Sequence, residues 1–118
     1  MADAIIDLAT FKELQDTAGA DFVIELVDTF LQEAPLMLAE LHSALAAGDA
    51  DKFRRAAHSF KSNSHTFGAM KLGAMARELE HKGLDLARQA DTGAPNALDA
   101  LAQEYGRVAA RLTGLCNG

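Results

Sequence analysis

The sequence predicts an all-α protein: an up-down four-helix bundle with a short additional N-terminal helix. Its 118 residues are rich in alanine, leucine and charged helix formers, include only two prolines and lack runs of β-branched residues. Apolar residues recur with helical spacing in segments joined by short connections, and such connections favour antiparallel neighbours. The length fits one domain, residues 1–118.

Local signals bound the first two helices. Asp7 precedes a brief helix that ends near Gly19, and Asp21 is the expected N-cap of a longer one. Pro35 either kinks that longer helix or begins a new one, and the apolar pattern then continues to Gly48.

Three more segments complete the bundle. A helix capped by Asp49 or Asp51 extends almost to Gly68, which interrupts the pattern, and the next helix reaches about Gln89. Residues 91–95 have the composition of a turn, and the last helix follows them.

Composition excludes several functional classes. The net charge of −6 argues against a nucleic-acid binder, and no apolar run is long enough to cross a membrane. The N-terminal segment carries acid where a signal peptide carries base, and the single cysteine, Cys116, cannot form an internal disulfide. We therefore expect a cytoplasmic protein. The start methionine close to the first helix suggests a free-standing protein rather than a piece of a larger kinase.

The charges are distributed unevenly. Residues 1–50 hold ten acidic residues against one lysine, whereas residues 51–88 hold eight basic residues against four acidic ones. Three of the four histidines also lie in this basic third of the chain. Either this is a solvated basic helix face, which is common, or it is a docking site for an anionic group.

The helix over residues 51–67 has a clear apolar face. If each residue advances about 100°, one stripe lies within roughly 60° of Phe53 and faces the core. That stripe consists of Phe53, Ala56, Ala57, Phe60, Ser64 and Phe67. His58 falls about 140° from Phe53, with Arg54, Lys61 and Ser62 as its helical neighbours. The spacing predicts an exposed imidazole flanked by cations and a hydroxyl.

Such an imidazole has two interpretations. At neutral pH it is largely uncharged, so a ring nitrogen keeps a lone pair and can act as a nucleophile. Adjacent cations would stabilise a phosphoryl group arriving at it. The alternative is a surface histidine with no chemical role, which is the commoner situation for an isolated histidine.

The motif around His58 resembles the signature of the histidine-containing phosphotransfer (HPt) family. It reads Ala57-His58-Ser59-Phe60-Lys61-Ser62-Asn63-Ser64 and continues through Gly68-Ala69, Leu72 and Leu79-Glu80. The resemblance extends over essentially the whole chain, because the segments before and after the motif match the helices of the family.

The resemblance implies roles for particular residues. His58 would be the phosphoacceptor and Lys61 would help to neutralise the phosphoryl group, although Lys61 could also be simply a solvated lysine. Arg54 and Ser62, which the helical spacing places one turn to either side of His58, would support the site. Gly68 would permit close packing where two helices meet near the site, although it could equally be only a helix C-cap. Family members usually carry glycine directly after the lysine, and Ser62 stands there instead, which puts the mode of docking in doubt.

The resemblance also implies partners. The sequence has no nucleotide-binding loop and no kinase catalytic motif, so the protein is expected to be a phosphotransfer intermediate and not an enzyme in the strict sense. His58 would accept a phosphoryl group from the receiver domain of a hybrid sensor kinase and pass it to the receiver of a response regulator. No cofactor of its own is expected, and the receiver would supply Mg²⁺.

Other readings remain open. The bundle could be an interaction module that binds a receiver without phosphate chemistry. A dimerising domain of a sensor kinase is disfavoured because Ser59, not an acid, follows the histidine, and we expect a monomer.

His65 is the rival phosphoacceptor, with less positive charge around it. Glu78, Glu80 and His81 do not share one helix face, so no metal site is expected.

Overall fold

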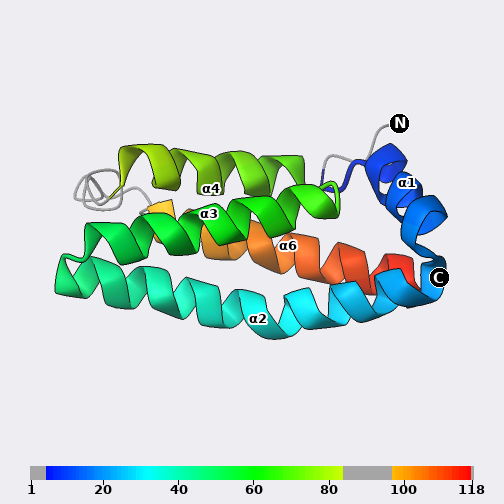
Figure 1. The fold of residues 1–118 in the computed structure, drawn as a ribbon, viewed down its shortest axis with the longest axis horizontal. Helices are drawn as coiled ribbons and strands as arrows, with labels where there is room; N and C mark the ends of the chain where they lie inside the picture. Colours follow the sequence, from blue (N-terminus) through cyan, green and yellow to red (C-terminus); the bar gives the residue numbers. More distant parts are fainter. Residues whose placement is uncertain (1–4, 84–96, 118) are drawn as a thin grey trace.

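The computed structural model describes residues 5–83 and 97–117, and this part of the chain forms five helices. They are α1 (Leu8–Ala18), α2 (Ala20–Ala47), α3 (Ala50–Thr66), α4 (Met70–Lys82) and α6 (Ala97–Asn117). Helices α2, α3, α4 and α6 run alongside one another, and α1 lies at the end of the bundle where α2 begins (Figure 1). The predicted all-α bundle with a short N-terminal helix is confirmed.

The hydrophobic core draws on all five helices. The stripe predicted for α3 is buried as expected, including Phe53, Phe60 and the residue after the helix, Phe67. At the middle of the bundle Phe30 of α2 contacts the rings of Phe60, Phe67 and Tyr105. Because these aromatic side chains hold one face of α3 against the core, the opposite face of α3 points outward.

The first helix closes one end of the bundle. Ile6 and Phe11 are buried in the core, whereas Leu8 is exposed. The amide of Asp7 donates to the carbonyl of Gly68 at 2.8 Å, which ties the start of α1 to the turn between α3 and α4. Most of the apolar side chains near the N-terminus therefore serve to cover the core.

Two helix boundaries differ from the prediction. Helix α2 begins at Ala20 with Gly19 as its N-cap, so Asp21 lies in the first turn and not at the cap. Its negative charge there interacts favourably with the positive end of the helix dipole. Helix α4 ends at Lys82 instead of near Gln89, because Gly83 adopts a φ of +64° and ends the helical geometry. The predicted turn at residues 91–95 lies outside the described residues.

Pro35 is accommodated inside one continuous helix, α2. Proline has no amide hydrogen, so the carbonyl of Leu31, four residues earlier, loses its usual helical partner. The hydroxyl of Tyr105 on α6 donates to that carbonyl at 3.4 Å, and burial of this hydroxyl raises the pKa of Tyr105. A bond between helices thus replaces the missing bond within α2.

Replacing Tyr105 with phenylalanine should therefore lower the free energy of unfolding by about 1 kcal/mol, the usual net value of one hydrogen bond. Urea denaturation would measure this loss. In a Pro35→Ala background the amide of residue 35 satisfies the Leu31 carbonyl, and the same change should cost clearly less. An equal loss in both backgrounds would show that the hydroxyl does not compensate for the proline.

Candidate functional site

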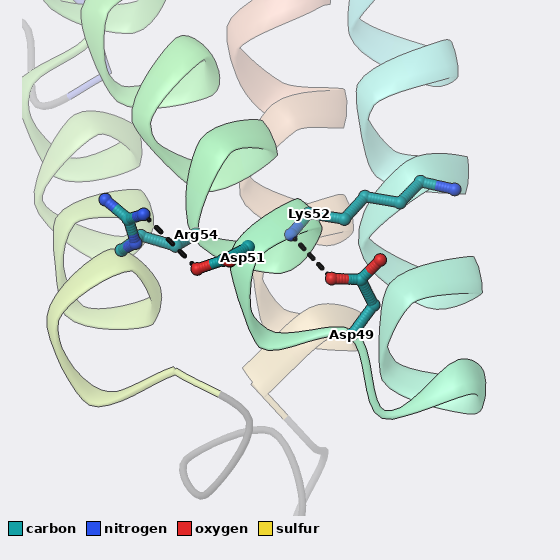
Figure 2. A network of polar contacts seen from close by, with 4 residues as sticks. All are labelled: Asp49, Asp51, Lys52 and Arg54. Atoms are coloured by element: carbon teal, nitrogen blue, oxygen red, sulfur yellow. Dashed lines mark hydrogen bonds and ion pairs between the residues drawn. The ribbon is translucent and has the colours of Figure 1, made fainter.

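The start of α3 is fixed by two aspartates (Figure 2). The carboxylate of Asp49 accepts from the backbone amide of Lys52 at 3.0 Å and so caps the helix, which decides between the two predicted caps. Asp51 instead contacts the guanidinium of Arg54 at 3.4 Å, an exposed pair one turn apart. The cap fixes where α3 begins, about two turns before His58.

His58 lies on the exposed face of α3, as its spacing predicts. Its side chain is 58% exposed, while its neighbour Ala57 is fully buried. The imidazole Nδ1 lies 2.7 Å from Oε2 of Glu80 on α4. Helix α4 returns antiparallel to α3 after the turn at Gly68, which brings a residue from late in α4 beside the middle of α3.

Glu80 joins His58 to Lys61. The ammonium of Lys61 lies 2.8 Å from Oε1 of Glu80, and these two side chains are only 21% and 16% exposed. Oε1 is buried, and its contact with Lys61 is an ion pair without the alignment of a hydrogen bond. The Lys61 contact is the strongest influence on the pKa of Glu80 and lowers it. Burial acts against this, and the contacts with His58 lower the pKa further, so that it lies below the ordinary 4.5.

This geometry assigns different tasks to the two imidazole nitrogens. A carboxylate only accepts hydrogen bonds, so the neutral imidazole facing Glu80 carries its proton on Nδ1. The other nitrogen, Nε2, then keeps its lone pair. Because the Glu80 contact also fixes the ring plane, Nε2 is the nitrogen of His58 able to attack an electrophile.

A surface hollow lies beside the imidazole. Its volume is about 410 Å³, and it is lined by Arg54, Arg55, His58, Ser59 and Glu80. Two guanidinium groups and a nucleophilic nitrogen at one hollow form a place where an anionic group can be held. Arg54 is therefore at the site, as the sequence predicts, and Arg55 is an addition to it.

Ser62 and Gly68 are placed differently. Ser62 is exposed, one turn after His58, on the outward ridge of α3. Gly68 follows the end of α3, about 15 Å from His58 along the helix axis. Its close packing is with the start of α1, not with the surroundings of the imidazole: an added Cβ would lie 2.7 Å from the carbonyl oxygen of Asp7 and 3.2 Å from Cβ of Thr10.

We expect Gly68→Ala to lower the free energy of unfolding by about 2–3 kcal/mol, because the new methyl group meets backbone and the φ of +84° is strained for alanine. Gly19 provides the matched control. Its φ is +94° and nothing lies within 4 Å of an added Cβ, so Gly19→Ala should cost about 1 kcal/mol through backbone strain alone. Equal losses in urea denaturation would contradict the proposed clash with Asp7.

The rival histidine has a different environment. An added Cβ at Gly73 would lie 2.3 Å from the ring atoms of His65, so this imidazole rests directly on the α4 backbone. None of the ion pairs in the described part of the chain involves His65. The carboxylate that would orient a nucleophilic imidazole is present at His58 and not at His65.

The sequence pattern alone assigns no role at the site to Glu80, although this residue belongs to the Leu79-Glu80 pair of the motif. If the two helices run antiparallel from Gly68, residues at equal distances before and after Gly68 lie side by side. His58 and Glu80 are each about three helical turns from Gly68, so this rule would have placed them near each other.

Within residues 5–83 and 97–117 no group of three metal-ligating side chains occurs. In the same residues no helix is long and apolar enough to cross a membrane.

Fold and site together define a helical bundle with an exposed histidine, His58, whose Nδ1 faces a carboxylate and whose Nε2 keeps its lone pair. The family model of the Hpt domain matches residues 25–111. The chain belongs to the Hpt domain family, whose members are phosphotransfer modules of phosphorelays and not classical enzymes. Searches of curated proteins and of solved structures found no match.

Proposed function

We propose that the protein accepts a phosphoryl group on Nε2 of His58 from the phosphoaspartate of one receiver domain and passes it to the aspartate of a second. The observation that carries this proposal is the 2.7 Å contact between Nδ1 of His58 and Glu80 on an imidazole that is more than half exposed. It leaves a nucleophilic nitrogen facing solvent, where a partner can reach it.

In the transfer, the lone pair of Nε2 forms a bond to phosphorus as the bond from phosphorus to the aspartate oxygen breaks, and the electron pair returns to the carboxylate. The proton on Nδ1 stays on the ring, which becomes positively charged. Glu80 stabilises that charge as it develops, in the way that a buried carboxylate stabilises an imidazolium in hydrolytic triads. In the second transfer an aspartate oxygen of the other receiver forms a bond to phosphorus as the bond from phosphorus to Nε2 breaks. The electron pair returns to Nε2, and the ring is neutral again.

The partners complete the reaction. Phosphoryl transfer depends on positioning and on electrostatic stabilisation of the equatorial oxygens. The receiver of a hybrid sensor kinase and the receiver of a response regulator would each supply an acidic pocket and Mg²⁺, and Lys61 would contribute positive charge from this chain. We propose that the protein acts as a cytoplasmic monomer.

The proposal is tested by incubating the protein with a phosphorylated receiver domain and following the label. We expect the label on this chain to be stable to base and labile to acid, as a phosphoramidate bond is, and peptide mass spectrometry should place it on His58. Stable binding of the phosphorylated receiver with no transfer of label would favour the alternative, an interaction module without phosphate chemistry.

A further inference from the structure

The charges around His58 are mostly compensated within the site. The ammonium of Lys61 is held 2.8 Å from Glu80, and the guanidinium of Arg54 lies 3.4 Å from Asp51. With a neutral imidazole, these two ion pairs bring no net positive charge to the hollow. A phosphoryl group on Nε2 carries up to two negative charges, and the phosphorylated ring supplies one positive charge, so without a further cation the group is only partly neutralised.

Arg55 is different from both of these cations. It is exposed and lines the hollow beside His58 together with Ser59. The same two residues also line a second hollow of about 530 Å³ between α3 and α2, where Glu33 and Glu40 form part of the opposite wall. Even so, no ion pair or hydrogen bond joins the Arg55 side chain to any described residue.

The position of Arg55 on α3 gives it access to the phosphoryl site. Figure 2 shows Arg54 on the side of α3 facing α4 and Lys52 on the side facing α2. One residue further along a helix is a rotation of about 100°, which places Arg55 on the outward ridge between these two sides. His58 is three residues further on, so the two side chains are neighbours on the helix surface.

We infer that Arg55 binds the phosphoryl group on Nε2 of His58 and supplies the positive charge that the Lys61–Glu80 and Arg54–Asp51 pairs do not. This inference rests on the proposed function and adds a phosphoryl-binding residue to it. Guanidinium is well suited to the task, because its planar fork can donate two hydrogen bonds to one phosphoryl group. Lys61 can make the same contact only by leaving Glu80, whereas Arg55 has no such partner among the described residues.

Phosphoramidate is a suitable probe, because it tests the residue without a receiver. The lone pair of Nε2 forms the new bond to phosphorus, the bond from phosphorus to nitrogen of the reagent breaks, and ammonia leaves. The rate of labelling would be measured by intact mass spectrometry and ³¹P NMR on the full chain as wild type, Arg55→Ala, Arg55→Lys, Arg54→Ala, Lys12→Ala and His58→Gln. Lys12, an exposed lysine on α1, controls for the loss of one positive charge elsewhere.

Arg55→Ala should slow labelling about tenfold, the value of one hydrogen bond to a charged group. Lys12→Ala should label at the wild-type rate, Arg54→Ala should be slowed less than Arg55→Ala, and Arg55→Lys should recover part of the loss. The difference between Arg55→Ala and wild type should shrink at high salt, since the contact is exposed.

Labelling of Arg55→Ala within twofold of wild type would overturn the inference while leaving the proposed function intact. An equal loss in Lys12→Ala would also overturn it, because the effect would then belong to the overall charge of the protein. Failure of the proposed function gives a different result: the wild type would acquire no label, or His58→Gln would acquire as much as the wild type.

Discussion

His58→Gln is expected to abolish phosphotransfer, with label on this chain falling below detection after incubation with a phosphorylated receiver. Glutamine is similar in size and polarity, and its amide can still meet the carboxylate of Glu80, so the bundle should remain folded. It has no nucleophilic nitrogen, however, because the lone pair of an amide is delocalised. The measurement is the amount of acid-labile phosphate on the variant relative to wild type, with circular dichroism to confirm the helical content.

The matched control is His65→Gln, which removes the other imidazole two turns along the same helix. His65 has no carboxylate within ion-pairing distance in the part of the chain that the structure describes. The variant should therefore accept label at close to the wild-type rate. If His58→Gln retained the label and His65→Gln lost it, the phosphoacceptor would be His65, and our proposal would be wrong.

The periodicity of α3 was sufficient to predict the direction of His58. Large apolar residues at Phe53, Phe60 and Phe67 leave the helix one rotation that buries all three, and the imidazole then faces outward. Capping was harder to predict, since Asp49 and Asp51 are both good N-caps and only the chain path through the preceding turn selects Asp49. Similarly, aspartate is a common N-cap residue, which favours Asp21, but Gly19 is the N-cap of α2 because the chain turns there with a positive φ.

Contacts between helices could not be predicted in the same way. The pairing of His58 with Glu80 depends on how α4 is shifted along α3, and that shift is set by the tight turn at Gly68 and its packing on Asp7. A single sequence carries no measure of this shift. The same is true of Tyr105, whose bond to the Leu31 carbonyl depends on the packing of α6 on α2. The direction in which a side chain points from its own helix can thus be predicted from spacing. Its contacts with a second helix can be known only from the assembled bundle.

Glu80→Ala is expected to slow phosphotransfer about 100-fold, because the carboxylate both orients the imidazole and stabilises the charge that develops on it. Glu80→Gln should lose less, about tenfold, since the amide oxygen still accepts from Nδ1 but brings no negative charge. Rates of label transfer from a phosphorylated receiver would measure both. Glu78→Gln is the matched control, because Glu78 lies on the same helix and pairs with exposed Lys82, away from the imidazole.

The same carboxyl should make stability depend on pH. Its pKa is lowered in the folded protein, so the unfolded chain binds its proton more readily as the pH falls. Glu80 therefore stabilises the fold fully above its ordinary pKa of 4.5, and this contribution is lost as the pH falls below that value towards the lowered pKa. The unfolding free energy of the wild type should fall more steeply than that of Glu80→Gln between about pH 5 and pH 3. Parallel pH profiles for the two proteins would show that the contacts of Glu80 with Lys61 and His58 do not hold its carboxylate in the charged form.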